Sequence, residues 1–317
     1  MNQTVNHSQD EEPATAIPQG GVLALGNFDG VHRGHQAVIA VTLDYARKHG
    51  IPARVLTLEP HPRSFLAMPQ TPFRLTPPSV KNRLLQALGI EEVITLDFSV
   101  ALARQLPRDF VEQMLVQHYH VQHVVAGTDF VFGHERTGSM SDMRAWLAPH
   151  GIDVTEVPPL RDETGEVISS SRVRAVLYQG DLDATRLLLG RPWSISGIIV
   201  RGAERGRLLG FPTANMDLGE FMRPPFGVYT VMAHRVGDQT LHPGVANIGV
   251  RPTVNGKHER LEFHLFHFSG DLYDQEWEVE LHHFLRPEQK FPNLEALQDQ
   301  IIIDIDKAKE KLKTLDK

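Results

Sequence analysis

The 317-residue sequence lacks several features that would point to common protein classes. It contains no cysteine, which excludes disulfide bonds, thiolate metal sites and cysteine nucleophiles. It also lacks an excess of positive charge, because Asp and Glu outnumber Lys and Arg and give a formal net charge of −7. Bulk attraction to nucleic acid or to an anionic membrane is therefore not expected. Any bound phosphate must be held by local cationic groups and backbone N–H donors.

Long apolar runs are missing as well. No run approaches the ~18 residues that a membrane span needs, so we expect no membrane partner and a cytoplasmic protein. Residues 1–19 are polar and acidic, without the apolar core of a signal peptide, and predict a disordered tail. Hydrophobic residues nevertheless make up 41% of the chain, which is enough for globular cores. The length suggests two domains.

The first predicted domain, residues 20–186, alternates strand and helix patterns. Apolar, β-rich runs predict strands at residues 22–25, 53–58, 91–98 and 123–127, and another within 153–160. Helical spacing predicts helices that begin near His35 and that span residues 80–90 and 108–119. This alternation predicts a parallel, Rossmann-like α/β sheet, whose ligands bind beyond the carboxyl ends of the strands.

The second predicted domain, residues 187–317, has a different pattern. After residues 190–192, short strands are separated by glycine and proline, which predicts an antiparallel barrel or sandwich. A final helix over residues 293–312 carries Leu294, Leu297, Ile301 and Ile305 at its apolar positions. We therefore expect an all-β domain that is closed by a C-terminal helix.

A turn rich in glycine, aspartate and histidine, GNFDGVHRGHQ over residues 26–36, joins the first predicted strand to the first helix. His32 and His35 are three residues apart and share one face of the helix start. Gly30 and Gly34 remove side chains where a ligand or a facing strand approaches the backbone. The free N–H groups of a helix N-terminus, joined by two imidazoles, suit a polyphosphate. A metal pair and ordinary surface histidines remain the alternatives from the residues alone.

A glycine-rich stretch in the second domain, GAERGRLLGFPTAN over residues 202–215, lacks the G-K-[ST] that a P-loop requires. Thr213 and Asn215 are two residues apart, so in an extended chain their oxygens lie on one side, where they suit Mg²⁺ bound to ATP. An ordinary glycine-rich turn is the equal alternative. Glu262 is flanked by Leu261 and Phe263, and a carboxylate among apolar neighbours is unusual unless it is paired or functional.

The histidine turn resembles the HxGH signature of the nucleotidyltransferase superfamily, in the version found in bacterial bifunctional riboflavin kinase/FAD synthetases. TLEPHP (residues 57–62), GTDFVFG (residues 127–133) and ISSSRVR (residues 168–174) are similar to three further motifs of that family, in the same order. GRLLGFPTAN resembles its riboflavin kinase signature, and the likeness extends over about residues 21–313. The resemblance implies a six-stranded Greek-key barrel for the second domain.

For the first domain the resemblance implies adenylyl transfer, in which the phosphate of FMN attacks the α-phosphate of ATP to give FAD and pyrophosphate. His32 and His35 would hold the ATP phosphates, and Ser170, Ser171 and Arg174 would close over them. Asp129 would lie near the nucleotide and the flavin. The serines could equally cap the helix that follows them. The expected ATP-binding residues are Gly26, Phe28, Asp29, Gly30, Gly34, Gly127, Asp129, Ser170, Ser171 and Arg174.

For the second domain the resemblance implies transfer of the ATP γ-phosphate to the riboflavin 5′-hydroxyl. Glu262 would be the catalytic base, because an alcohol needs a proton acceptor at neutral pH. Thr213 and Asn215 would contact Mg²⁺. The expected ATP-binding residues of this domain are Gly202, Gly206, Arg207, Gly210 and Pro212.

Two residues depart from the family pattern: His267 replaces the usual Asp, and Asp274 replaces a glycine that would serve a turn. The expected partners are thus ATP, riboflavin and FMN, with the oligomeric state left open. Three other interpretations are an enzyme with one live activity, a non-catalytic flavin sensor and a tRNA-charging enzyme. The complete motifs argue against the first two. The acidic charge and the lack of an anticodon-binding extension argue against the third.

Overall fold

The computed structural model describes residues 20–67, 71–201, 210–253 and 256–313. The predicted tail over residues 1–19 lies outside the described residues. Gly202, Gly206 and Arg207 of the predicted kinase loop also lie outside them.

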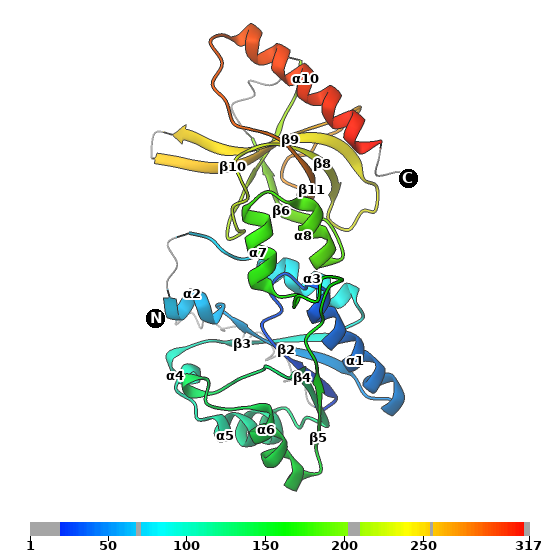
Figure 1. The fold of residues 1–317 in the computed structure, drawn as a ribbon, viewed down its shortest axis with the longest axis vertical. Coiled ribbons are helices and arrows are strands. Elements are labelled where there is room, and N and C mark those ends of the chain that lie inside the picture. Colours follow the sequence, from blue (N-terminus) through cyan, green and yellow to red (C-terminus); the bar gives the residue numbers. More distant parts are fainter. Residues whose placement is uncertain (1–19, 68–70, 202–209, 254–255, 314–317) are drawn as a thin grey trace, which may run out of the picture.

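The N-terminal domain is built on a five-stranded parallel sheet in the order β3-β2-β1-β4-β5, which confirms the predicted α/β class (Figure 1). Its strands are β1 (Val22–Leu25), β2 (Ala53–Glu59), β3 (Glu92–Asp97), β4 (His123–Gly127) and β5 (Asp153–Val157). All four residues of β1 are buried, as expected for a central strand covered on both faces. The strand order reverses between β1 and β4, so the loops after these two strands flank the switch point where such sheets bind ligands.

The helices of this domain begin with α1, which follows β1 directly. They are α1 (Arg33–His49), α2 (Pro62–Ala67), α3 (Pro78–Ala87), α4 (Val100–Ala103), α5 (Pro107–Asp109), α6 (Met140–Leu147), α7 (Ser170–Tyr178) and α8 (Leu182–Leu189). Three shorter or irregular helices are the 3₁₀ turns η2 (His134–Arg136) and η3 (Ala148–His150) and the π-helix η1 (Phe110–His118). The predicted helix over residues 108–119 is thus mostly π-helical, since its backbone N–H groups reach carbonyls five residues back, as Tyr119 does to Met114.

The C-terminal domain is a closed, six-stranded antiparallel barrel in the order β10-β7-β6-β11-β8-β9. Its strands are β6 (Trp193–Val200), β7 (Ala214–Asp217), β8 (Gly227–Arg235), β9 (His242–Thr253), β10 (Gly256–Leu265) and β11 (Glu276–Pro287). The strands β8, β9 and β10 form a meander, and β7 lies beside β10, which is the predicted Greek-key arrangement. The barrel rather than the sandwich is therefore confirmed.

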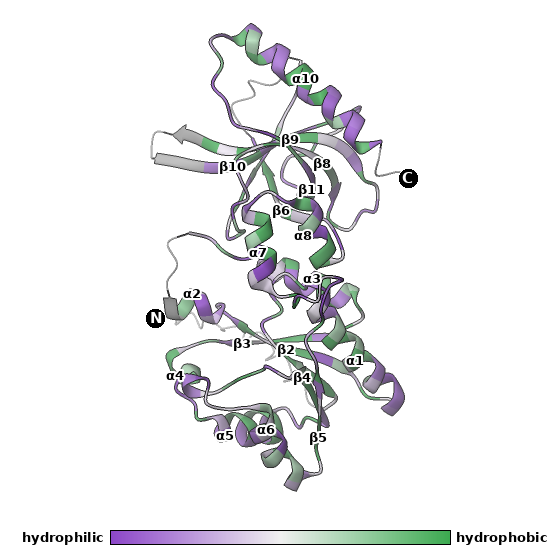
Figure 2. Ribbon diagram, viewed as in Figure 1, coloured by the Kyte–Doolittle hydropathy of each residue, from purple (hydrophilic) through white to green (hydrophobic). Residues whose placement is uncertain are grey.

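The predicted C-terminal helix is α10 (Leu294–Leu312), capped by Asn293, whose side chain accepts a hydrogen bond from Ala296 N. Figure 2 shows polar and apolar residues alternating along it. Ile305, Ala308 and Leu312 pack against Phe266 of the barrel. Leu294, expected on the apolar face, is instead exposed, because the packed face begins further along the helix.

One of the apolar clusters contains residues of both domains. Leu75, Val173 and Leu188 belong to the same buried cluster as Trp193 and Leu281 of the barrel. Trp193 also donates a hydrogen bond from Nε1 to Leu75 O at 2.9 Å. The helices α7 and α8 lie between the sheet and the barrel (Figure 1). The expected boundary at residues 186–187 falls within α8, so the chain passes from one domain to the other through packed structure.

Candidate functional site

The histidine turn follows the buried strand β1 and leads directly into α1. His32 is the N-cap of α1, and its Nδ1 accepts a hydrogen bond from His35 N at 3.3 Å. The two rings stack with centroids 3.6 Å apart. A Cβ on Gly34 would meet the His32 ring and Ile168 O, each at 3.1 Å, so glycine leaves the room that this stacking requires. The structure thus brings the predicted pair together at a helix N-terminus.

Burial keeps both imidazoles neutral. It lowers the pKa of His32 to about 4, assisted by the nearby cations Arg174 and Arg191 and opposed by Asp29. Burial likewise lowers the pKa of His35 well below its ordinary value, with His32, Arg174 and Lys81 acting in the same direction. Since Nδ1 of neutral His32 is an acceptor, its proton resides on Nε2, which can donate to a phosphate oxygen.

The backbone before His32 is strained. Phe28 and Val31 adopt left-handed φ angles of 52° and 42°, and such a conformation is a clear outlier for a β-branched residue. Val31 N donates to Phe28 O, and Arg191, just after α8, donates to the carbonyls of Gly30 and Val31. Strain of this kind persists only where surrounding contacts over-determine it, and it concentrates at functional sites.

Asp29 is buried and its carboxylate is occupied inside the protein. It accepts hydrogen bonds from Leu75 N and Thr76 N and pairs with Arg174 of α7. Gly30 N in turn donates to Thr76 Oγ1, and a Cβ on Gly30 would come within 2.7 Å of the Leu75 side chain. Asp29 is one of the residues expected to bind ATP, but its carboxylate is already bonded to the backbone of Leu75 and Thr76 and to Arg174.

The serines of the ISSSRVR motif have two different roles, capping α7 and binding the histidine turn. Ser169 is the N-cap of α7, and its side chain accepts from Arg172 N. Ser170 and Ser171 are the first helical residues, and Ser170 Oγ donates to Asp29 O at 2.8 Å, while Ser171 is exposed. The capping role thus falls on the serine before the predicted pair, and the histidine turn and the start of α7 lie side by side.

The remaining expected residues of this domain lie at strand ends. Gly26 follows β1 and donates from N to Leu56 O, and Phe28 packs its buried ring edge-on against His35 at 5.2 Å. Gly127 ends the neighbouring strand β4, and Asp129 is exposed two residues later. A hollow of about 400 Å³ opens beyond the end of β3 and is lined by Leu96, Asp97, Ser99, Ala101, Leu102, Gln105 and Met114.

The expected kinase residues that the structure describes lie close together on the barrel. Glu262 of β10 lies opposite Asn215 of β7 on one side and Asn247 of β9 on the other. Its sequence neighbours Leu261 and Phe263 are fully buried in the barrel, so they point away from it, because side chains alternate along a strand. The argument from apolar neighbours was therefore wrong, although the position among two amides remains distinctive.

The segment that precedes β7 is hydrogen-bonded to the face of β10 that carries Glu262. His264, two residues after Glu262 and on the same face, contacts Pro212 O through Nδ1 at 2.8 Å. Thr213 and buried Asn215 follow directly. Gly210 has a left-handed φ of 85°. The part of the expected kinase loop that the structure describes thus runs beside Glu262.

The two departures from the family pattern are both turn residues. His267 and Asp274 are exposed and adopt left-handed φ angles of 56° and 59°. Asp274 therefore tolerates the geometry that a glycine would serve, as predicted. In the described residues, no three His, Asp or Glu side chains are grouped as a metal site.

The sequence analysis missed several residues of the first site: Glu59, Arg74, Lys81 and Val31. Lys81 Nζ is buried and bonded to Glu59 Oε1 at 2.7 Å and Thr57 Oγ1 at 2.9 Å. A lysine among the regularly spaced apolar positions of α3 was a signal that could have revealed it. Nothing in the one-dimensional pattern identified Arg74 as its neighbour.

The fold and site together define a nucleotide-dependent transferase with an HxGH-bearing α/β domain joined to a six-stranded barrel. The FAD synthetase family model matches residues 14–172, and the riboflavin kinase family model matches residues 189–312. The chain belongs to the bifunctional riboflavin kinase/FMN adenylyltransferase family.

Relatives of that name match along almost their whole length. The protein from Escherichia coli K12 is 39% identical over 91% of this chain and 92% of its own, and that from Bacillus subtilis is 36% identical over 93% and 92%. A solved structure named as a macrolide-efflux protein from Streptococcus pneumoniae aligns with a TM-score of 0.79 and 32% identity, over 90% of this chain and 93% of its own. Across the described residues, no helix is both long and apolar enough for a membrane span.

Proposed function

We propose that the α/β domain adenylylates FMN and that the barrel phosphorylates riboflavin, each with ATP. Membership of the bifunctional family supports both activities, with riboflavin, FMN and ATP as substrates. The observation that carries the assignment of sites is that each domain presents its own polar cluster. One is a neutral histidine pair at a helix N-terminus, and the other is a carboxylate between two amides.

In adenylyl transfer, a phosphate oxygen of FMN attacks the α-phosphorus of ATP, and the bond to the β-phosphate breaks to release pyrophosphate. The attacking phosphate is already ionised, so no base is needed. His32 and His35 donate hydrogen bonds to oxygens on which charge accumulates, and the free N–H groups of α1 act with them. Ser171 and Arg174 at the start of α7 close over the phosphates, with Arg174 released in part from Asp29.

We assign the flavin ring of FMN to the hollow beyond β3. Its lining combines apolar Leu96, Leu102 and Met114 with polar Asp97 and Ser99, as is usual for pockets that hold flat aromatic ligands. Asp129 and Gly127, at the end of β4, then face the nucleotide. The proposed position of FMN is beyond the carboxyl ends of the strands, where open α/β sheets bind ligands.

In the kinase reaction, the riboflavin 5′-hydroxyl attacks the γ-phosphorus of ATP, and Glu262 accepts its proton as the new bond forms. Thr213 and Asn215 offer neutral oxygens, the kind of ligand that suits Mg²⁺ carried by ATP phosphates. The metal, when bound, neutralises charge on the transferring phosphate. Gly210 and Pro212 belong to the part of the expected ATP loop that the structure describes.

The cytoplasm is the compartment we assign to both reactions. Both consume ATP, and a chain without cysteine needs no oxidising environment.

The test is to incubate the purified protein with riboflavin, ATP and Mg²⁺ and to separate riboflavin, FMN and FAD over time. We expect FMN to appear first and FAD to follow, and both to stop when a chelator removes Mg²⁺. A parallel reaction that starts from FMN isolates the second step. Formation of neither product would refute the proposal, and formation of one alone would reduce it to a single activity.

A further inference from the structure

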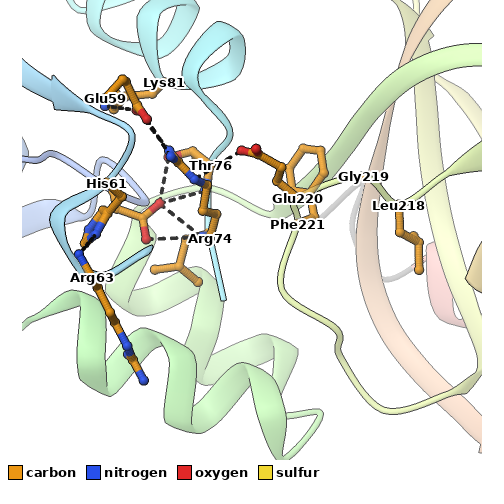
Figure 3. A network of polar contacts seen from close by, with 12 residues as sticks. Glu59, His61, Arg63, Arg74, Thr76, Lys81, Leu218, Gly219, Glu220 and Phe221 are labelled. Atoms are coloured by element: carbon orange, nitrogen blue, oxygen red, sulfur yellow. Dashed lines mark hydrogen bonds and ion pairs between the residues drawn. The ribbon is translucent and has the colours of Figure 1, made fainter. Parts of the chain in front are cut away.

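Four charged side chains form a row that crosses the boundary between the domains (Figure 3). Lys81 Nζ lies 2.7 Å from Glu59 Oε1, and the guanidinium of Arg74 binds both Glu59 oxygens. The opposite edge of the Arg74 guanidinium lies 3.1 Å, through Nε, from Glu220 Oε2 of the barrel domain. We call this row, Lys81–Glu59–Arg74–Glu220, the charge ladder.

The N-terminal end of the charge ladder is tied to the histidine turn. Lys81 also donates to Thr57 Oγ1, which donates in turn to Asn27 O within the turn. Arg74 belongs to the segment Phe73–Thr76, whose N–H groups at positions 75 and 76 hold Asp29. Displacement of Arg74 therefore moves the backbone that anchors the strained loop before His32.

The other end of the charge ladder is tied to the barrel. Met222 N donates to Arg74 O at 2.7 Å, and Arg74 pairs with Phe221 in a parallel bridge. Glu220 is three residues beyond the end of β7, the strand that carries Asn215. The loop that holds Arg74 thus begins at the predicted metal-binding strand of the kinase site.

The charge ladder joins two buried cations to two carboxylates, of which Glu59 is largely covered and Glu220 is exposed. Arg74 and Lys81 are almost fully buried, with 7% and 2% of their side-chain surface exposed, and they share one carboxylate, Glu59. Burial raises the pKa of Glu59, but hydrogen bonds from Arg74 and Lys81 outweigh it and hold the pKa below its ordinary value. The carboxylate is thus ionised and binds both buried cations, and Glu220 adds a second carboxylate beside Arg74.

We propose that Arg74 and Glu59 are positioning residues for adenylyl transfer, and that the kinase domain holds them in register through Glu220. The inference rests on the proposed function, since it concerns the geometry of the adenylyltransferase site. It assigns to a barrel residue an effect on the reaction of the other domain. A buried ion pair alone is weak support for stability, so the expected effect is on geometry rather than on folding.

The test changes Glu220 to Gln, which removes the charge of an exposed residue and leaves the Arg74–Glu59 pair in place. Adenylylation of supplied FMN should fall about 3- to 10-fold, the usual range for coupling through packed networks, and the loss should be in kcat rather than in KM for FMN. Riboflavin phosphorylation should stay within about 2-fold of the parent, because Glu220 pairs with Arg74 of the α/β domain.

Glu276→Gln is the matched control. Glu276 also pairs across the domain boundary, with Arg83 of α3 at 2.8 Å, and its side chain is 40% exposed, against 64% for Glu220. Arg83 contacts Glu276, Glu278 and Ser196 of the barrel rather than Glu59. The control variant should therefore keep the parent rate of adenylylation.

A second variant, Arg74→Lys, keeps the charge but cannot reach Glu59 and Glu220 at once. It should reproduce the kcat loss, and adding Glu220→Gln to it should cause no further loss. The inference is overturned if Glu220→Gln matches Glu276→Gln, if the two losses multiply, or if both activities and the melting temperature fall together. A parent protein that forms no FAD from FMN would instead refute the proposed function, and the inference with it.

Discussion

The two candidate sites of this chain handle charge in opposite ways. The site in the α/β domain has the buried cations Arg74 and Lys81 and the partly buried Arg174 beside two neutral histidines, and Glu59 and Asp29 hold these cations. The barrel site places one carboxylate, Glu262, on the outer face of a strand between two neutral amides. On the proposed assignment, the first arrangement stabilises negative charge that the substrates bring, and the second accepts a proton.

This difference matches the two nucleophiles. A phosphate monoester arrives ionised and needs positioning and charge stabilisation, whereas an alcohol must lose its proton as it reacts. The comparison teaches that two ATP-dependent steps on neighbouring flavins need distinct chemistry, and that each domain provides only one kind. Four measurements test it, from the largest expected effect to the smallest.

The largest effect is expected from changing His32 and His35 together to Ala. Removing one donor aimed at developing charge costs about 10²–10³-fold in rate, so the double variant should lose at least about 10⁴-fold in FAD formation from FMN. FMN formation from riboflavin should survive, since the pair lies outside the barrel. His49→Ala, at the exposed C-terminal end of the same helix, is the control. Unchanged FAD synthesis in the folded double variant would contradict the assignment.

The next effect is expected from Glu262→Gln, which keeps size and hydrogen bonding but cannot accept a proton. Loss of a general base costs about 10²–10⁴-fold, so riboflavin phosphorylation should fall by that order while Mg-ATP still binds. Adenylylation of FMN should be unaffected. Both rates are measured on one folded preparation, and equal loss of both activities would show that the two sites are not separate.

A smaller effect concerns stability and pH. The folded pKa of His32 is about 4, below its unfolded value of 6.5, so as pH falls the unfolded chain binds a proton first. The contribution is complete above pH 6.5 and is lost as pH falls towards 4, amounting to about 3 kcal/mol in full. Denaturant unfolding at pH 7.5 and 5 measures it. His32→Gln should show a distinctly smaller loss than the parent, and an equal loss would mean that His32 is not buried as described.

The smallest effect is expected from Asp274→Gly. The residue has a left-handed φ of 59°, which glycine adopts without strain, but glycine also gives the unfolded chain more freedom. The two effects nearly cancel, so we expect a change in stability within about 1 kcal/mol and no change in either activity. A large loss of kinase activity would show that this aspartate has a role in the barrel site.

Sequence periodicity predicted most of the fold, because buried parallel strands and amphipathic helices leave regular patterns. The switch from α/β to all-β near residue 190 was visible for the same reason. The π-helical form of residues 110–118 was not, because a register change in backbone hydrogen bonds leaves no apolar signature. The exact end of the first domain was not predictable either, because α8 contacts α7 of the first domain as well as β6 and β11 of the barrel.

Sequence analysis of the site identified residues better than relations between them. His32 and His35 were predicted as a pair, but the N-cap role of His32 was not, because Ser, Thr, Asp and Asn usually cap helices. The case for Glu262 used neighbours that turned out to face the opposite side of the strand. Arg74 could not be connected with Glu59 or Glu220 at all, because contacts between residues far apart in sequence arise only when the chain folds.

The shared core described above has a consequence for how the protein melts. Leu75 and Val173 pack in the same dry cluster as Trp193 and Leu281, so neither half can open without exposing apolar surface of the other. We therefore expect the unfolding of the two halves to be coupled through this cluster, and the fluorescence of the buried Trp193 to report its loss.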